Sequence, residues 1–292
     1  MKTTQLLRRF RIDRPAQFRL AGRDCAETCG LDMDKDEAKA ALKSDLERLS
    51  NLQERLYAHD RWSVLVILQG MDASGKDSVI KHVMSGINPQ GCEVTSFKAP
   101  SAEELDHDYL WRHVMRLPTR GRIGIFNRSY YEEVLVVRVH PELLERQQLP
   151  DSLAEAGVWR RRFSDIRGFE RHLVNNGTRV LKVFLHLSRE EQSKRFLDRI
   201  DDPEKRWKFN AGDIAERKLW NRYMAAYEDM IRHTSTREAP WYVVPADDKW
   251  FCRMVIAAAL VRMLEDLRPQ YPRVDETMLR EMRKARKALL AE

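Results

Sequence analysis

The chain has 292 residues, of which 43% are hydrophobic and 33% charged, and its formal net charge is +7. This length suits one large α/β domain with appendages or two small domains. The positive charge indicates a polyanionic partner such as a nucleotide, an inorganic polyanion, nucleic acid or an acidic membrane face. No apolar run approaches the ~20 residues that span a bilayer, and the basic N-terminus lacks the apolar segment of a secretory signal. The four cysteines complete no zinc spacing, so we predict reduced thiols in a cytoplasmic protein.

Residues 1–33 show no clear periodicity and carry scattered charge. We predict that they form an extended arm that packs over the body of the protein or over a neighbouring subunit. From Asp34 to Asp60, apolar residues recur at helical spacing, and Asp34 or Asp36 can cap that helix. The tail, residues 271–292, is predicted to be a charged, peripheral helix.

The stretch after this first helix carries the strongest signal in the chain. Val64 to Leu68 is a continuous apolar run, which predicts a strand buried on both faces. It ends at Gly70, where the pattern G-x-x-x-x-G-K begins, and helical spacing follows from Asp77. A strand, a glycine-bounded loop and a helix in this order predict a phosphate-binding loop, with an ordinary strand-to-helix turn as the weaker alternative. The predicted phosphate-binding residues are Gly70, Ala73, Ser74, Gly75, Lys76, Asp77, Lys81 and, farther along the chain, Arg128.

Two carboxylates make this loop unusual. Asp77 stands where Ser or Thr normally offers a hydroxyl to Mg²⁺, and Asp72 lies inside the loop. Carboxylates repel phosphate unless a hard cation lies between them, so we predict Mg²⁺, or alternatively Mn²⁺, as the cofactor, with Asp72 as a ligand.

Further strands are predicted over residues 92–97, 123–127, 179–187 and 241–245, with helices between them. Ser101 with Glu104 predicts a capping box for a helix that runs to about Leu117, and Ser188 with Glu191 predicts another. One further helix is expected over about 211–233. Alternating strands and helices favour a parallel sheet covered on both faces, and ligands should lie at the carboxyl ends of its strands.

The strand at 123–127 leads into N-R-S-Y-Y-E-E. In a phosphate-loop fold, the metal-side acidic residue belongs at the end of the neighbouring strand, and here that position is Asn127. Arg128 beside it can clamp a phosphoryl group in a bidentate manner. Glu132 and Glu133 follow, although the segment also suits a simple helix start capped by Ser129.

Charged and aromatic side chains gather around an irregular segment at residues 201–209. Basic and aromatic groups beside a break in the chain are what a mobile lid over a polyphosphate would need. We therefore predict a lid over about 195–220. A solvated connection between helices is an equally good interpretation of any one of these residues.

Five segments together resemble the polyphosphate kinase 2 family: GMDASGKD, FKAPSAEELDHDYLW, GRIGIFNRSYYEEVLVVRVHPE, DDPEKRWKF and PWYVVPADDKW. They follow one another in the order the family has, from about Asp34 to Leu267. The resemblance implies a three-layer α/β/α P-loop kinase-like domain over 34–270, with a parallel sheet and a helical lid.

The same resemblance implies Mg²⁺-dependent phosphoryl transfer between inorganic polyphosphate and a nucleotide. It places Asp72, Lys76 and Asp77 in the Walker A loop and Asn127 and Arg128 at the Walker B position, and it assigns Arg195, Arg199 and Lys208 to the lid. Many relatives have Asp where this chain has Asn127, which leaves Glu132 or Glu133 as substitute metal ligands. The expected catalytic residues are Asp72, Lys76, Asn127, Arg128 and Glu132.

The form NRSYYEE is similar to the subgroup called class III, which phosphorylates nucleoside mono- and diphosphates. The implied partners are therefore polyphosphate and adenine nucleotides, with guanine nucleotides as a further option, and a homo-oligomer (dimer or tetramer) is expected.

An ATP-dependent nucleoside-monophosphate kinase of the thymidylate kinase type is the main alternative. A nucleic-acid-binding protein is less favoured, because no known nucleic-acid-binding module is recognisable. A structural nucleotide sensor is also disfavoured by the dense charged site.

Overall fold

The computed structural model describes residues 3–31, 35–154 and 157–292. Its centre is a five-stranded sheet in the order β2-β3-β1-β4-β5, and every neighbouring pair is parallel. The strands are β1 (Ser63–Gln69), β2 (Cys92–Ser96), β3 (Ile123–Asn127), β4 (Thr178–His186) and β5 (Trp241–Pro245). All five predicted strands are confirmed, with ends that differ by at most one residue.

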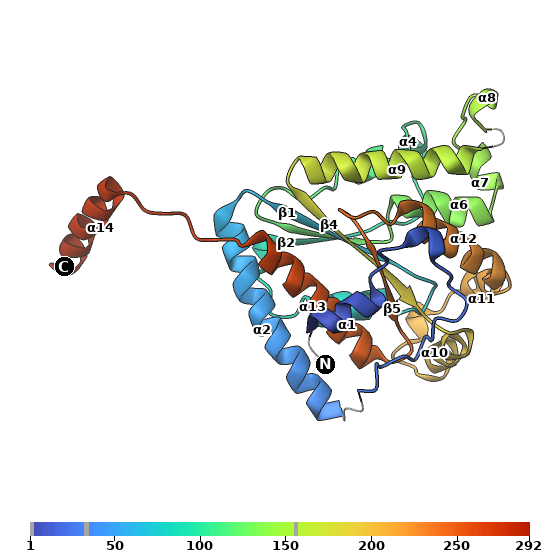
Figure 1. The fold of residues 1–292 in the computed structure, drawn as a ribbon, viewed down its shortest axis with the longest axis horizontal. Helices are drawn as coiled ribbons and strands as arrows, with labels where there is room; N and C mark the ends of the chain where they lie inside the picture. The colour runs from blue at the N-terminus through green and yellow to red at the C-terminus, as the bar shows by residue number, and fades with distance from the viewer. Residues whose placement is uncertain (1–2, 32–34, 155–156) are drawn as a thin grey trace.

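Helices cover both faces of the sheet (Figure 1). Along β1, Val64 and Val66 pack into one apolar cluster, whereas Leu65 and Ile67 pack into a second cluster on the opposite face. The first cluster includes α1 (Thr3–Phe10), α2 (Lys35–His59), α3 (Lys76–Val83) and α13 (Lys249–Leu267), and the second includes α9 (Val158–Asn175) and α12 (Trp220–Thr234). The three-layer α/β/α prediction is therefore confirmed.

Shorter helices make up the connections. They are η1 (Pro15–Gln17), η2 (Pro89–Gly91), α4 (Ala102–Leu105), α5 (Trp111–Val114), η3 (Tyr130–Val134), α6 (Val136–Val139), α7 (Glu142–Glu145), α8 (Asp151–Ala154), α10 (Arg189–Asp201), η4 (Arg206–Lys208) and α11 (Ala211–Arg217). None of the helices among the described residues is both long enough and apolar enough to cross a bilayer.

Two segments that were each predicted to form one continuous helix are divided into two helices. The Ser101–Glu104 capping box is present, but the helix stops at Leu105, and the Asp108 carboxylate then accepts a hydrogen bond from the Leu110 N–H. This local side-chain bond competes with the helical ladder and separates α4 from α5. The helix expected over 211–233 is likewise divided into α11 and α12, with Leu219 between them.

The second predicted capping box is only half formed. The Ser188 hydroxyl accepts a hydrogen bond from the Glu191 N–H, as expected. The Ser188 N–H, however, donates to the Asp247 carboxylate, and the Glu191 carboxylate accepts from Arg195 instead. A contact between distant segments has thus replaced the local one.

The N-terminal arm is more ordered than predicted. Residues Thr3–Phe10 form α1, whose Leu6, Leu7 and Phe10 side chains are buried against the body of the same chain. Beyond α1, the Ile12 N–H donates to the Trp241 carbonyl at the edge of the sheet. Of the two proposed caps of α2, Asp34 lies outside the described residues and Asp36 lies within the helix.

The C-terminal helix α14 (Glu276–Leu289) stands apart from the body on an extended connector (Figure 1). All of its residues are exposed, and they include the apolar side chains of Met278, Leu279, Met282 and Leu289.

Candidate functional site

The phosphate-binding loop joins β1 to α3, and its backbone geometry suits an anion. Gly75 has φ of +103°, in the left-handed region that glycine tolerates best, and α3 begins directly after it. At Gly70, a side-chain Cβ would lie 2.7 Å from the Ser74 Oγ and 2.9 Å from the Leu185 carbonyl oxygen. The loop therefore requires glycine at both ends of the motif, and it presents the helix N-terminus to the cavity.

Lys76 is the first residue of α3 and lies almost completely buried beside the loop. Its Nζ donates hydrogen bonds to the carbonyls of Gly70 (2.7 Å) and Met71 (3.1 Å). Burial and, to a smaller extent, the nearby charge of Arg128 lower the pKa of Lys76 to about 8, although the carboxylates around it oppose this. An anion that enters the loop would favour the charged ammonium and restore its positive charge.

Arg128 connects the loop to β3. Its guanidinium lies 2.6 Å from the Asp72 carboxylate and 3.4 Å from that of Glu132, and Gln69 also donates to Glu132 at 2.9 Å. Attraction to Glu132 and Asp72 raises the pKa of Arg128, although burial opposes this. The backbone of Arg128 has φ of +64°, which is uncommon for a residue with a side chain, and its N–H donates to the Leu68 carbonyl. Sheet and loop together therefore fix the direction of this guanidinium.

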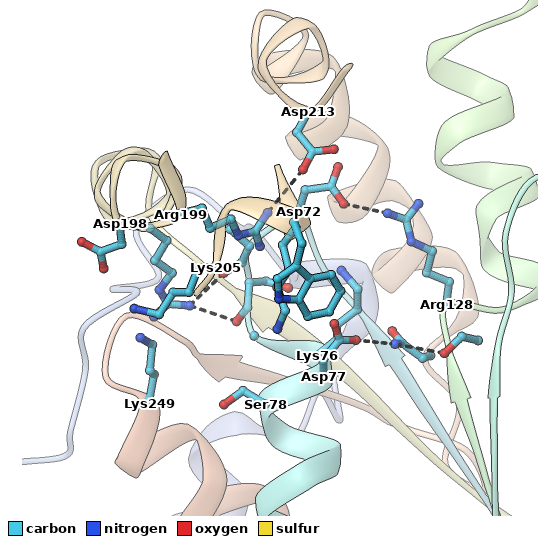
Figure 2. Close-up of a pocket in the computed structure, with 18 of the residues that line it drawn as sticks. Asp72, Lys76, Asp77, Ser78, Arg128, Asp198, Arg199, Lys205, Asp213 and Lys249 are labelled. Carbon is cyan, nitrogen blue, oxygen red and sulfur yellow. Dashed lines mark hydrogen bonds and ion pairs between the residues drawn. The ribbon is translucent and has the colours of Figure 1, made fainter. Parts of the chain in front are cut away.

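The predicted metal ligands offer hard oxygen atoms. The Asn127 amide donates to the Asp77 carboxylate at 2.7 Å, while its buried Oδ1 atom has no hydrogen-bond partner among the described residues. Asp72, Asp77 and Asn127 all line one cavity (Figure 2). The described residues contain no ready-made group of three His, Cys, Asp or Glu side chains for a metal. This oxygen set suits Mg²⁺ that takes its other ligands from phosphate and water.

Neither glutamate of the η3 segment lines this cavity. Glu132 is held by Gln69 and Arg128, and Glu133 accepts a hydrogen bond at 2.7 Å from Gln147, on the far side of η3. Burial raises the pKa of Glu133. The structure therefore does not support Glu133 as a substitute metal ligand, and it places Glu132 behind Arg128.

The cavity has a volume of about 820 Å³ and lies between the phosphate-binding loop and the predicted lid segment (Figure 2). Nine basic side chains and four aspartates line it, and this excess of positive charge favours a polyanion. The basic residues are Lys76, Lys98, Arg128, Arg195, Arg199, Lys205, Lys208, Lys249 and Arg253.

The lid residues Arg199 and Lys208 reach this cavity. Arg199 pairs with Asp213 at 3.4 Å, which connects α10 to α11. The Lys208 Nζ lies 4.9 Å from the centre of the Trp207 ring, and that indole is 77% exposed. An exposed aromatic side chain beside cations is what the lid prediction expects, and the lid stays a prediction.

Two predicted residues are placed differently from the prediction, although Arg195 still lines the cavity. Arg195 lies beneath the loop rather than above it: its guanidinium donates to the carbonyls of Ala73 and Ser74 on one side and of Ala246 and Asp247 on the other. Lys81 is exposed on α3 and does not line the cavity, because α3 directs it away from the loop.

Several cavity residues were not expected from the sequence, chiefly Lys98, Lys249 and Arg253, whereas Lys205 belongs to the segment 201–209 that was assigned to the predicted lid. Lys249 and Arg253 lie one turn apart in the first turns of α13, directly after β5, and Arg253 donates to the Ser78 hydroxyl at 2.8 Å. Because ligands gather at the carboxyl ends of parallel strands, basic residues that follow β5 could have been assigned to the site from their position alone.

Comparison with known proteins agrees with this geometry. The model of the family "Polyphosphate kinase 2 (PPK2)" matches residues 32–272. The chain is 52% identical over 257 residues to an ADP-polyphosphate phosphotransferase of Rhodopseudomonas palustris, covering 88% of this chain and 89% of the relative. It is 46% identical over 266 residues to an AMP/ADP-polyphosphate phosphotransferase of Meiothermus ruber, covering 91% and 96%.

The fold has a solved counterpart. The crystal structure of polyphosphate kinase 2 from Arthrobacter aurescens TC1 superposes with a TM-score of 0.87 at 39% identity, covering 100% of this chain and 97% of that one.

Proposed function

The chain belongs to the polyphosphate kinase 2 family, and on this premise we propose that it transfers phosphoryl groups between inorganic polyphosphate and adenine nucleotides, phosphorylating AMP to ADP and ADP to ATP. The observation that carries the proposal is the convergence of Lys76 and the Arg128–Asp72 pair on one cavity with many cations. Polyphosphate carries about one negative charge per phosphate unit, so a cavity of this charge suits it.

The chain's own residues act by positioning and by electrostatics. Lys76 and the loop N–H groups neutralise charge on the phosphate that is transferred, and Arg128 holds an adjacent phosphate oxygen. The attacking oxygen belongs to a nucleotide phosphate that is already ionised, so no general base is required. Glu132, which hydrogen-bonds Arg128, acts as a positioning residue and orients the acceptor through it.

Mg²⁺ is the proposed cofactor, and Mn²⁺ is a chemically similar substitute. Asp72, Asp77 and the unpaired Oδ1 of Asn127 would hold it. When bound, the ion would supply positive charge that offsets the negative charge of the phosphates.

We propose both AMP and ADP as acceptors for two reasons. One relative is named an ADP-polyphosphate phosphotransferase and the other an AMP/ADP-polyphosphate phosphotransferase, and the NRSYYEE segment matches the class III form. Guanine nucleotides offer the same phosphates, and they are a second acceptor class to be measured.

The test is incubation of the purified protein with Mg²⁺ and long-chain polyphosphate, with AMP in one reaction and ADP in another, followed by chromatography of nucleotides. ATP from both reactions is expected, and a Lys76→Ala variant should give almost none. Product from only one acceptor would exclude the dual-acceptor proposal. Transfer that needs ATP as donor and fails with polyphosphate would instead show a monophosphate kinase of the thymidylate kinase type.

We also propose that the protein is a homo-oligomer in which α14 contacts a second copy. Isolated helices of 14 residues are marginal in water, so α14 gains stability only if its apolar stripe is covered. The extended connector holds that stripe away from its own body (Figure 1).

A further inference from the structure

A second basic hollow lies on the N-terminal arm, away from the site described above. It has a volume of about 520 Å³, and its lining comes entirely from residues 8–23. Five arginines contribute to it: Arg8, Arg11, Arg14, Arg19 and Arg23. It shares no lining residue with the reaction cavity, and it lies outside residues 32–272, which the family model matches. We call it the arm hollow.

The positive charge of the arm hollow is almost uncompensated. Its lining includes one carboxylate, Asp13, which lies 2.9 Å from Arg11. Arg19 and Arg23 donate to backbone carbonyls, and within the described parts of the chain the guanidinium groups of Arg8 and Arg14 have no hydrogen bond or ion pair. Guanidinium groups gathered in this way repel one another, and an anion with several oxygens would relieve that repulsion.

The arm hollow is built on ordered structure. The Ile12 N–H donates to the Trp241 carbonyl, and the Leu20 N–H donates to the Glu228 carboxylate at 2.7 Å. The Phe18 side chain is buried between these anchors, and the Arg23 guanidinium lies 5.6 Å from the centre of its ring. The arginines are thus held on a fixed backbone, which lowers the entropy cost of binding.

The arm leads from the hollow to the rim of the reaction cavity. Just beyond Arg23, the Cys25 carbonyl accepts a hydrogen bond at 3.1 Å from the Asp247 N–H. The Asp247 carbonyl in turn accepts from Arg195, which lines the reaction cavity, as does Lys249 two residues on. In Figure 1 the blue segment after α1 runs beside α12 toward this end of the sheet.

We propose that the arm hollow binds a second stretch of the same inorganic polyphosphate chain whose end reacts at the phosphate-binding loop. The proposal rests on the proposed function. A linear polymer of phosphates supplies closely spaced anionic oxygens that match several guanidinium groups. Nucleic acid fits less well, because the one aromatic residue in the lining, Phe18, is buried and offers no exposed face for a base.

Two sites on one polymer give a chain-length effect. A long chain held by the arm has a high effective concentration at the loop, whereas a short one cannot reach both sites. The arm hollow should therefore lower the KM for long polyphosphate and leave the KM for tripolyphosphate unchanged.

The experiment compares an Arg14→Gln/Arg19→Gln variant with a charge-matched control, Arg146→Gln/Arg171→Gln, whose arginines are exposed and line neither cavity. Initial rates with ADP are measured against long-chain polyphosphate and against tripolyphosphate. The arm variant should raise the KM for the long donor about tenfold with kcat unchanged, and the control should raise it less than twofold. An equal rise for both variants, an equal rise for both donors, or no rise would overturn the proposal.

A binding measurement separates failure of this proposal from failure of the proposed function. Filter binding of labelled long-chain polyphosphate to Lys76→Ala protein, with and without the arm substitutions, needs no turnover. Loss of binding with the arm substitutions supports the arm hollow even if wild-type protein transfers no phosphate. Unchanged polyphosphate binding, or tighter arm-dependent binding of duplex DNA than of polyphosphate, would contradict it.

Discussion

The guanidinium of Arg128 lies 2.6 Å from the carboxylate of Asp72, so the end of β3 and the phosphate-binding loop share one ion pair across the reaction cavity. Both residues line that cavity, and neither is fully buried. A phosphate or a metal ion that enters must compete for this pair. A phosphate would attract the guanidinium and leave the carboxylate available to a cation. A cation would attract the carboxylate and leave the guanidinium available to a phosphate.

The first prediction concerns Arg128. On the proposed mechanism, replacement by Gln removes a cation that holds a phosphate oxygen, and kcat should fall about 10²–10³-fold, as for loss of one donor to a developing charge. The control is Arg138→Gln, because Arg138 pairs with Asp229 at the same 2.6 Å but does not line the cavity. Steady-state kinetics with ADP and polyphosphate measure both variants. Equal losses of kcat would show that Arg128 acts only in structure.

The second prediction concerns pH. Because the pKa of Lys76 is lowered to about 8, the free enzyme loses this charge as pH rises through 8, and kcat/KM should fall about fivefold from pH 8 to pH 9. The free energy of unfolding changes in the opposite direction, because it rises with pH. Below pH 8 the buried lysine is charged, and its burial destabilises the folded state in full. The unfolded chain keeps the lysine proton up to its ordinary pKa of 10.5, so this destabilisation is relieved as pH rises from 8 to 10.5.

The check is a pH profile of kcat/KM for the wild type and for Lys76→Arg, whose guanidinium stays charged throughout this range. The variant should lose the decline above pH 8 even where its overall rate is lower. A decline of equal size in both proteins would assign the titration to another group.

Most of the sheet and the phosphate-binding loop could be predicted from the sequence, because local signals specify them. Val64 to Leu68 is an unbroken apolar run, and Gly70, Gly75 and Lys76 follow it at the required spacing. Helix α1 could not be predicted from the sequence, because its eight residues are too few to show a helical period. Its stability depends on the packing of Leu6, Leu7 and Phe10 against the body of the protein.

Arg195 shows why part of the site could not be predicted. In the sequence it is a charged helical residue four positions after Glu191, which is typical of an exposed helix face. In the structure its guanidinium is buried between the loop carbonyls and those of Ala246 and Asp247, some fifty residues away. Only the tertiary fold brings these carbonyls together.

The third prediction follows from that burial. Arg195→Gln leaves carbonyls of two segments without a charged donor and should lower the free energy of unfolding by about 3 kcal/mol. Arg199→Gln alters a partly exposed lid residue that pairs with Asp213, so it should reduce activity and change stability by less than about 1 kcal/mol. Urea denaturation together with kinetics separates the two. Equal stability for both variants would mean that Arg195 does not support the loop.

The fourth prediction concerns α14. Met278→Glu/Met282→Glu places charge on exposed apolar positions of α14 and should reduce the proposed homo-oligomer to a smaller species, measured by light scattering after size-exclusion chromatography. The control is Arg280→Glu/Lys284→Glu, on other positions of the same exposed helix. An unchanged mass for the methionine variant would exclude α14 as the contact between copies.

The fifth prediction concerns a buried ion pair behind η3. The Lys182 Nζ lies 2.6 Å from the Glu170 carboxylate, and both side chains are almost inaccessible. Hydroxyls of Tyr130 and Tyr131 donate to the other Glu170 oxygen at 2.9 and 2.7 Å. This network fixes the turn that follows Arg128. Because removal of one partner leaves an unpaired buried charge, Lys182→Met should lower the free energy of unfolding by about 3–5 kcal/mol.

The double variant Lys182→Met/Glu170→Gln decides whether the effect comes from charge or from lost packing. Removing both charges leaves a neutral carboxamide that still accepts from the tyrosines, so the double variant should regain about half of the loss measured for Lys182→Met. Both variants and the single Glu170→Gln variant are measured by urea denaturation at one pH. If the losses from the two sites were simply additive, packing of the lysine stem would explain the effect. Coupling between them would assign it to the ion pair that holds the η3 turn, and with it Arg128, against the sheet.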